Sequence, residues 1–261
     1  MDTAHRARKR FGQNFLVDQS VVDRIVLSLR LQPQQRLVEI GPGHGALTEA
    51  LLDAGADLLV IELDRDLAAA LQRRHAGNPR LQIIQADALK VDLSALDEQP
   101  FRLIGNLPYN ISSPLLFHFA DHHGAWIDAH LMLQREVAER LAASPGDSSY
   151  SRLSVMMSLY AHTELLFEVP AQAFSPQPKV VSGVVRLTPR QPELQQVDAR
   201  QAFSEFVRNA FAQRRKTLAN NLRGRLDRDA IKALDIDPGV RPQQLDLDQF
   251  LRLFAAWQAG Q

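Results

Sequence analysis

Residues 38–48 read VEIGPGHGALT, an apolar run followed by a glycine-rich turn and the beginning of a helical pattern. Glycines between a buried strand and a helix allow a tight turn and let the backbone approach a ligand closely. Gly41, Gly43 and Ala46 also satisfy the GxGxxG/A fingerprint of dinucleotide-binding proteins, so a nicotinamide-dependent oxidoreductase is one alternative. The segment predicts a nucleotide-like ligand held against Gly41 and Gly43.

Short apolar runs alternate with helical patterns around this segment, which is typical of a parallel α/β sheet. Strands are expected at residues 36–40, 57–61, 81–85, 101–104, 130–133, 164–169 and 180–187. Helices are expected at residues 18–29, 46–53, 66–75, 114–121 and 136–143. Ser113 before Pro114 has the pattern of an N-cap followed by proline at the first helical position. We therefore expect a Rossmann-like α/β fold with a seven-stranded, mostly parallel sheet.

The pattern changes near residue 189. Residues 189–196 are polar and contain two prolines, as expected of a linker. Beyond them no strand pattern recurs, and the apolar residues have helical spacing. The sequence therefore predicts two domains, an α/β domain at residues 1–188 and a small all-helical domain at residues 189–261.

Two acidic residues follow neighbouring strands of the predicted sheet. Glu62 ends the second strand, 21 residues after Gly41, where a carboxylate can grip both ribose hydroxyls of an adenosine. Asp87 comes just after the third strand, where it can accept a hydrogen bond from the exocyclic amine of adenine. Glu62 suits NAD equally well, but methyltransferases use the three strand ends together for the nucleoside half of S-adenosylmethionine.

The loop after the fourth strand, GNLPYNI at residues 105–111, favours methyl transfer. An exocyclic amine is a poor nucleophile because its lone pair is delocalised into the ring. The side-chain oxygen of Asn106 and the carbonyl of Pro108 could accept its two N–H groups and so free the lone pair. Tyr109 offers a flat face on which an extruded base can stack. A dehydrogenase has no use for this arrangement.

The chain resembles the ribosomal RNA adenine dimethyltransferases over nearly its whole length. The resemblance lies in FGQNFL (11–16), EIGPGHGALT (39–48), Glu62, Asp87, NLPYNIS (106–112), FSPQPKVVS (174–182) and FAQRRKTL (211–218). It is greatest to the bacterial small-subunit branch. It implies a class I methyltransferase that dimethylates N6 of two adjacent adenosines in a hairpin loop near the 3′ end of 16S rRNA. The partner would be this rRNA in the small subunit or its precursor, and the role would be in small-subunit biogenesis.

The same resemblance implies the residues of the site. Contacts with S-adenosylmethionine are expected from Asn14, Leu16, Gly41, Glu62, Asp87 and Asn106. Phe174 lies in a loop stiffened by prolines, where its ring could stack on the adenine opposite Tyr109. Lys179 in the same segment could meet a phosphate, although a solvated lysine is an alternative.

The net charge is zero, with 30 basic and 30 acidic residues, but the charges are distributed unevenly. Residues 1–10 contain four basic side chains, and residues 208–228 contain seven against one acid. A basic face of this kind suits a polyanion, although a solvated helix surface is the alternative. We expect RNA contacts from Arg8, Lys9, Arg10, Lys179, Arg214, Arg215 and Lys216.

Several classes of protein are disfavoured. The chain has no cysteine, which excludes disulfides and thiolate catalysis, and the histidines lack the spacing of a metal site, so no metal is expected. The sequence contains no run of about 18 apolar residues, so no membrane span is expected. We expect a monomeric cytoplasmic protein, with a mitochondrial transit peptide as the alternative interpretation of the basic start.

Three functional alternatives remain. One is the antibiotic-resistance adenine methyltransferase of the large subunit, which shares the catalytic loop. Another is a non-catalytic assembly or transcription factor that keeps the fold and binds nucleic acid. The third is the NAD oxidoreductase, which fails for want of catalytic residues.

Overall fold

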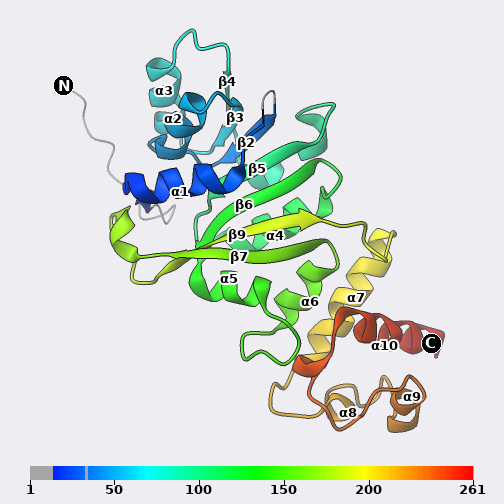
Figure 1. Cartoon of the computed structure of the whole chain (residues 1–261). Coiled ribbons are helices and arrows are strands. Elements are labelled where there is room, and N and C mark those ends of the chain that lie inside the picture. The colour runs from blue at the N-terminus through cyan, green and yellow to red at the C-terminus, as the bar shows by residue number, and fades with distance from the viewer. Residues whose placement is uncertain (1–13, 33–34, 261) are drawn as a thin grey trace. The chain divides into compact units, whose positions relative to one another are not determined.

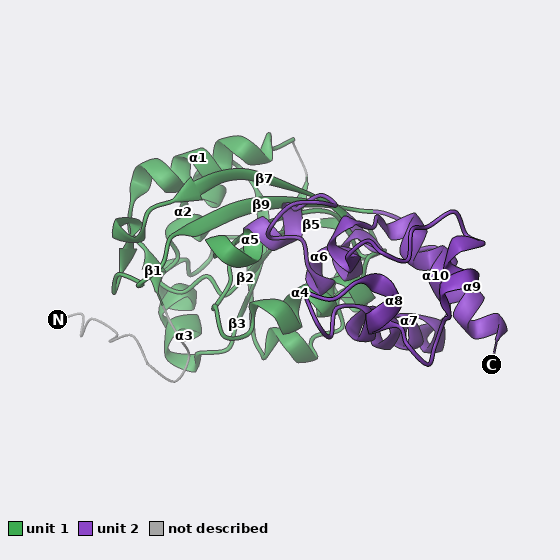
Figure 2. Ribbon diagram, turned by 90° about the horizontal axis from the view of Figure 1, so that it is seen from below, with its two compact units in different colours: residues 1–138, 162–189 green, residues 139–161, 190–261 purple. Residues whose placement is uncertain are grey.

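The computed structural model describes residues 14–32 and 35–260, which form two compact units (Figure 2). Unit 1 spans residues 1–138 and 162–189, and unit 2 spans residues 139–161 and 190–261. Unit 1 carries the sheet and the glycine turn, so it contains the elements that position the candidate site.

A seven-stranded sheet forms the centre of unit 1 (Figure 1). In spatial order its strands are β4 (Leu81–Gln85), β3 (Asp57–Glu62), β2 (Arg36–Ile40), β5 (Phe101–Asn106), β6 (Trp126–Gln134), β9 (Ser182–Pro189) and β7 (Ala161–Val169). The first five pair in parallel, and β9 runs antiparallel to β6. The central strands β2, β3 and β5 are buried and mainly apolar, as expected where helices cover both faces of a parallel sheet. The predicted seven-stranded, mostly parallel sheet is confirmed.

Four helices of unit 1, and a fifth, α5, that continues from unit 1 into unit 2, lie where the sequence predicts helices. They are α1 (Gln19–Leu29), α2 (Ala46–Asp53), α3 (Arg65–Arg74), α4 (Ser112–Asp121) and α5 (Arg135–Ala142). Asp18 is the N-cap of α1, because its side chain accepts a hydrogen bond from the backbone N–H of Ser20 at 2.9 Å. Unit 1 also contains the shorter elements η2 (Ala88–Lys90), η3 (Leu93–Ala95), η4 (Ala171–Ala173) and the antiparallel pair β1 (Phe15–Leu16) and β8 (Phe174–Ser175).

The predicted start of α4 is wrong. Ile111 is the N-cap, and the helix begins at Ser112 rather than after Ser113. The hydroxyl of Ser112 donates to the carbonyl of Tyr109 at 3.1 Å, which winds the chain into the helix early. Pro114 still fits, because the N–H groups of a first turn have no partner within the helix.

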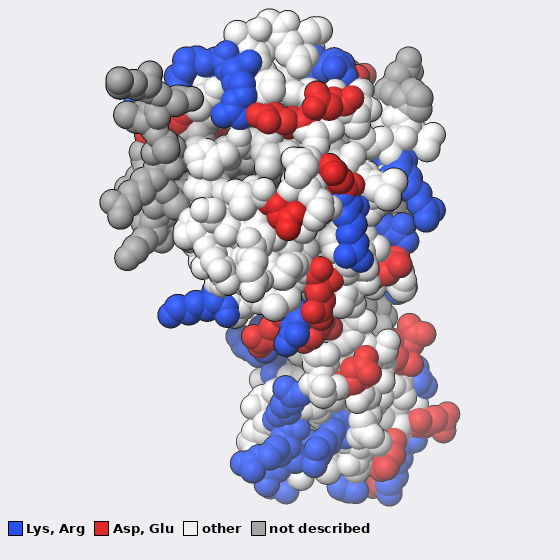
Figure 3. Space-filling model, turned by 60° about the vertical axis from the view of Figure 1, so that its left-hand side comes forward, with Lys and Arg blue, Asp and Glu red and all other residues white. Residues whose placement is uncertain are grey.

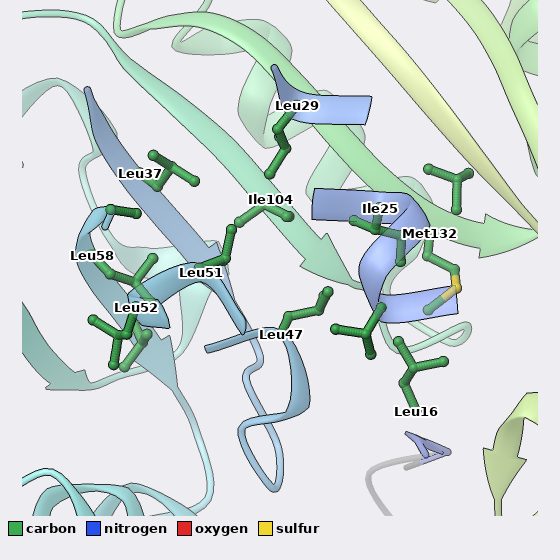
Figure 4. Packing of buried hydrophobic residues seen from close by; sticks show 14 of the residues in the cluster. Leu16, Ile25, Leu29, Leu37, Leu47, Leu51, Leu52, Leu58, Ile104 and Met132 are labelled. Atoms are coloured by element: carbon green, nitrogen blue, oxygen red, sulfur yellow. The ribbon is translucent and has the colours of Figure 1, made fainter. Parts of the chain in front are cut away.

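A buried apolar cluster fixes the helix that follows the glycine turn (Figure 4). Leu47 and Leu51 of α2 point toward Ile104 of β5 and toward α1 (Figure 4). Each such side chain, when fully buried, contributes about 1.5–3 kcal/mol to stability. Packing on the sheet therefore holds α2 in place, and with it the turn from which α2 starts.

Unit 2 is largely helical. It contains α6 (Arg152–Ser158), α7 (Val197–Ala210), α8 (Leu218–Asn221), α9 (Arg228–Lys232), η5 (Pro242–Gln244) and α10 (Leu247–Ala259). Aromatic rings join α7 to α10, with the centroids of Phe203 and Phe254 5.3 Å apart. Residues 139–161, which the sequence grouped with the α/β domain, cluster with unit 2. They do so because α6 contacts α7, where Arg152 donates to the hydroxyl of Ser204 at 2.8 Å.

A largely buried ion pair links β5 and β6 near the amino-terminal ends of these strands, opposite the strand ends that carry the glycine turn. The guanidinium of Arg102 donates to both oxygens of Asp128, at 2.8 and 2.6 Å, and also donates to the carbonyl of Leu29 at the end of α1. Burial alone would raise the pKa of Asp128. The neighbouring His130 ring and the Arg102 guanidinium outweigh burial and lower this pKa to about 2.

The lowered pKa of Asp128 predicts a loss of stability in acid. The ionised carboxylate is favoured in the folded state, so its contribution is complete above the ordinary pKa of 3.8 and is lost as the pH falls toward about 2. We expect this pH-dependent part to be about 1–2 kcal/mol. Urea unfolding of the wild type and Asp128→Asn between pH 6 and pH 2.5, roughly the window of the titration, measures it. The difference between the two proteins should narrow with falling pH, and a constant difference would contradict the assignment.

Candidate active site

A cavity opens in unit 1 where the carboxyl ends of the parallel strands meet. The strand order reverses between β2 and β5, and ligands of open α/β sheets bind at such a switch point. Nine of the expected site residues line the cavity: Asn14, Leu16, Gly41, Gly43, Glu62, Asp87, Asn106, Pro108 and Tyr109. Residues from five separate stretches of the sequence are thus brought together around one space.

The glycine turn forms one wall of this cavity. Gly41 and Gly43 have φ angles of +67° and +60°, which residues with a side chain rarely adopt. A Cβ atom on Gly43 would lie 2.8 Å from the ring of Phe15, so this position has no room for one. A Cβ on Gly41 would meet nothing within 4 Å, which leaves its backbone open to a ligand in the cavity.

Glu62 supports the turn and faces the same cavity. Its side chain is buried, and its two oxygens accept the backbone N–H groups of Gly43 at 3.1 Å and Asp64 at 2.8 Å. Burial raises the pKa of the carboxyl, and the two N–H groups oppose this rise. Each carboxylate oxygen has a second lone pair, so Glu62 can hold the turn and still accept hydroxyl groups of a ligand.

Asp87 lies on the next strand end. Its Oδ1 atom accepts the backbone N–H of Leu89 at 3.1 Å and caps the turn η2. The side chain is therefore held in one orientation with Oδ2 able to accept an amine. Glu62 and Asp87 therefore face one cavity from neighbouring strand ends.

Asn106 ends β5 and is tied to the N-terminal segment. Its amide nitrogen donates to the carbonyl of Asn14 at 3.0 Å, across 92 residues of sequence. This bond leaves Oδ1 as the part of the amide that accepts. The carbonyl of Pro108 accepts the N–H of Ile111 at 3.1 Å and keeps a second lone pair. Two acceptors therefore lie two residues apart on one short loop.

Tyr109 is half-buried on the same loop. Its hydroxyl lies 2.7 Å from Oγ of Ser182, and its carbonyl accepts the hydroxyl of Ser112. Burial raises the pKa of the phenol and the contact with Ser182 opposes the rise, so the hydroxyl remains neutral at physiological pH. The ring keeps its place in the lining of the cavity and can offer a face to a base.

Phe174 does not lie where the sequence suggested. Its side chain is 3% exposed and belongs to the apolar cluster, where it pairs with Leu16 across β1 and β8. It is not part of the cavity lining. The physical reason is that pairing of β8 with β1 places Phe174 beside Leu16, where its side chain is buried in the apolar cluster.

Replacing Phe174 by leucine should therefore reduce stability more than methyl transfer. A smaller apolar side chain leaves a partly filled space, and we expect a loss of about 1–2 kcal/mol in the free energy of unfolding. Melting curves and transfer rates of the purified variant distinguish the two roles. A tenfold loss of transfer at an unchanged melting temperature would instead support stacking on the base.

The expected RNA-binding residues have different positions. Arg8, Lys9 and Arg10 lie outside the described residues. Lys179 is exposed in unit 1 and does not line the cavity. Three further cationic residues are exposed in unit 2: Arg214, Arg215 and Lys216. On the face in Figure 3, Lys and Arg side chains form a dense group in the lower part of the view.

Two further groups at the site were not predicted. Glu39 of β2 lines the cavity at 1% exposure and accepts the hydroxyl of Thr48 at 2.6 Å. Burial raises the pKa of its carboxyl to about 7. Ser182 is the other group, and its contact with Tyr109 becomes visible only in three dimensions. The signal for both was their position in the motifs at residues 39–48 and 174–182.

Neither a metal cluster nor a membrane span is found in the described part of the chain. Residues 14–32 and 35–260 contain no group of three or more His, Cys, Asp or Glu that could hold a metal ion. None of the helices described in this structure is both long enough and apolar enough to cross a bilayer.

The sheet order, with a cavity at its switch point lined by Glu62, Asp87 and Asn106, is that of a class I, Rossmann-like methyltransferase. Two solved structures share the fold across 94% of this chain. The 23S rRNA methyltransferase ErmE is 28% identical, with a TM-score of 0.74 and all of that chain covered. A dimethyladenosine transferase from Plasmodium falciparum is 26% identical, with a TM-score of 0.77 and 98% of that chain covered.

The chain belongs to the ribosomal RNA adenine dimethylase family, whose family model matches residues 4–259. Two curated relatives are more similar to this chain than these two structures are. Ribosomal RNA small subunit methyltransferase A of Chromohalobacter salexigens is 53% identical over 96% of this chain and 91% of the relative. The protein of the same name from Hahella chejuensis is 52% identical over 95% and 92%.

Proposed function

We propose that this protein transfers methyl groups from S-adenosylmethionine to N6 of two adjacent adenosines near the 3′ end of 16S rRNA. The substrate is the small subunit or its precursor, and the reaction belongs to small-subunit biogenesis in the cytoplasm. The observation that carries the proposal is the meeting of Asn106, Pro108 and Tyr109 with Glu62 and Asp87 around one cavity. The shared name of relatives near 50% identity supports the small subunit as the source of the RNA.

The residues present fit the methyl donor. Glu62 accepts the ribose hydroxyls, Asp87 accepts the adenine amine, and the open backbone at Gly41 takes the part of the donor that crosses the turn. The remaining expected contacts come from Asn14 and Leu16, which close the cavity from the N-terminal side. When bound, S-adenosylmethionine supplies a methyl group already activated by its positively charged sulfur.

The loop after β5 prepares the nucleophile. The flipped adenine stacks on Tyr109, while Oδ1 of Asn106 and the carbonyl of Pro108 accept the two hydrogens of N6. The lone pair of N6 is then directed at the methyl carbon. The new N–C bond forms as the S–C bond breaks, and the proton leaves the positively charged nitrogen to solvent. Alignment of the two reactants can supply up to about 7–11 kcal/mol of the acceleration.

A second methyl transfer to the same nitrogen uses the same groups. After the first transfer N6 retains one hydrogen, which one of the two acceptors still holds. A fresh molecule of donor then meets the monomethylated amine. Dimethylation therefore requires that the base lies in the same plane, stacked on Tyr109, at each of the two transfers.

Residues 189–261 form the domain that binds rRNA, and residues 1–188 form the catalytic domain. Arg214, Arg215 and Lys216 would contact phosphates, with Lys179 and the basic start of the chain adding to them. The protein acts as a monomer.

Parallel methylation assays test the proposed function. Small subunits without these methyl groups, large-subunit rRNA and free 16S rRNA are each offered with radiolabelled S-adenosylmethionine. We expect labelled dimethyladenosine in 16S rRNA of the small subunit. Label confined to the large-subunit RNA would favour the activity of the ErmE relative, and no label in any RNA would favour a non-catalytic assembly factor.

A further inference from the structure

The phenol of Tyr109 has a partner that the proposed mechanism does not use. Oγ of Ser182 lies 2.7 Å from the tyrosine hydroxyl, although 73 residues separate the two in sequence. The hydroxyl of Ser112 meanwhile holds the carbonyl of Tyr109 at 3.1 Å. Tyr109 is therefore tied at its backbone and at the far end of its ring.

Ser182 is built into a rigid part of unit 1. It is 0% exposed, begins β9 and pairs with Gln134 at the end of β6. The preceding carbonyl, that of Val181, accepts the N–H of Arg135 at 2.9 Å. A Cβ on the next residue, Gly183, would lie 2.9 Å from Ala138, so the strand packs closely against α5 at this point. The serine hydroxyl is thus held at a fixed position relative to the sheet.

We propose that Ser182 is a positioning residue that holds the ring of Tyr109 in the orientation onto which the adenine stacks. This inference rests on the proposed function and adds a residue to it. A tyrosine on a loop can rotate about its side-chain bonds, and fixing it when the base arrives costs free energy. The hydrogen bond to Ser182 fixes the ring beforehand. Burial raises the pKa of the phenol, so the hydroxyl stays protonated and can either donate to or accept from Oγ of Ser182.

The test is a double-mutant cycle on the full-length protein. Ser182→Ala removes the anchor, and Tyr109→Phe keeps the ring but removes the hydroxyl. Each variant should lower the rate of methyl transfer at saturating RNA by roughly fivefold to tenfold, the equivalent of one buried hydrogen bond. The combined variant should be no slower than either single one, because both remove the same interaction.

Three further measurements separate positioning from folding. The KM for undermethylated small subunits and the affinity for S-adenosylmethionine should change by less than about twofold, since neither phosphate contacts nor Glu62 is altered. Ser154→Ala is the matched control, because Ser154 is also buried and its hydroxyl donates to the carbonyl of Arg140 in unit 2. This control should lower the melting temperature about as much as Ser182→Ala and leave the rate constant unchanged.

Different results overturn different statements. An undiminished rate constant in Ser182→Ala, or single effects that multiply in the combined variant, would overturn the role of Ser182 while the proposed function stands. A wild-type protein that methylates no RNA under the same conditions would remove the proposed function and this inference with it.

Discussion

Replacing Asn106 by alanine is expected to reduce methyl transfer by about 10²–10³-fold, the usual effect of removing one preorganised polar group from a reacting centre. In the proposed mechanism Oδ1 of the amide accepts from N6, while the amide nitrogen donates to the carbonyl of Asn14 at 3.0 Å. Affinity for the small subunit should remain nearly unchanged, because phosphate contacts elsewhere supply most of it. Single-turnover transfer and filter-binding measurements check the two halves of this expectation.

Asn106→Asp separates the two functions of the amide. Aspartate keeps an oxygen that can accept from N6, but it cannot donate to the carbonyl of Asn14. If acceptance dominates, this variant transfers methyl groups faster than the alanine variant. If the tie to Asn14 dominates, both variants are equally slow. Full activity in the alanine variant would contradict the mechanism proposed for the loop.

The parts of the fold that depend on local patterns were predictable. The sequence placed β2 and α2 at their observed bounds, because an apolar run, three glycines and an amphipathic segment each have a local physical meaning. The meeting of Glu62, Asp87 and Asn106 was also predictable, since parallel strands bring their carboxyl ends to one edge of the sheet. This topological rule predicts that the three residues meet even though the sequence gives no distances between them.

Other features depend on contacts that no local pattern encodes. In the sequence, Phe174 is followed by polar residues and prolines. Its burial follows from its pairing with Leu16, 158 positions earlier in the chain. The contact of Ser182 with Tyr109 requires the register of β9 on β6. The grouping of residues 139–161 with unit 2 arises from packing of α6 on α7. Each depends on a partner far away in the chain.

Changing Arg214, Arg215 and Lys216 together to alanine is expected to weaken binding to the small subunit by about a hundredfold at 0.1 M salt. Each phosphate contact releases condensed counterions and contributes roughly 0.7–0.9 to the slope of log affinity against log salt. Three lost contacts should therefore flatten the slope by about 2–3. Affinity for S-adenosylmethionine should not change, because none of the three lines the cavity. Titrations at three or more salt concentrations measure the slope.

A charge-matched control distinguishes a local binding surface from net charge. Arg73, Arg80 and Lys232 are also exposed, and their removal changes the net charge by the same amount at scattered positions. If net charge controlled binding, both triple variants would weaken it equally. If Arg214, Arg215 and Lys216 form a local binding surface, the control variant should keep the wild-type slope of log affinity against log salt.

An alternative role for Arg214, Arg215 and Lys216 is to stabilise unit 2. Their surroundings favour RNA binding over this alternative. Arg214 donates to the carbonyl of Ser148, but within residues 14–32 and 35–260 none of the three cationic side chains is ion-paired with Asp246 or Asp248. Exposed cations without a carboxylate partner contribute little to folding and remain available to phosphates. A fall in melting temperature with an unchanged salt slope would remove Arg214, Arg215 and Lys216 from the RNA-binding surface.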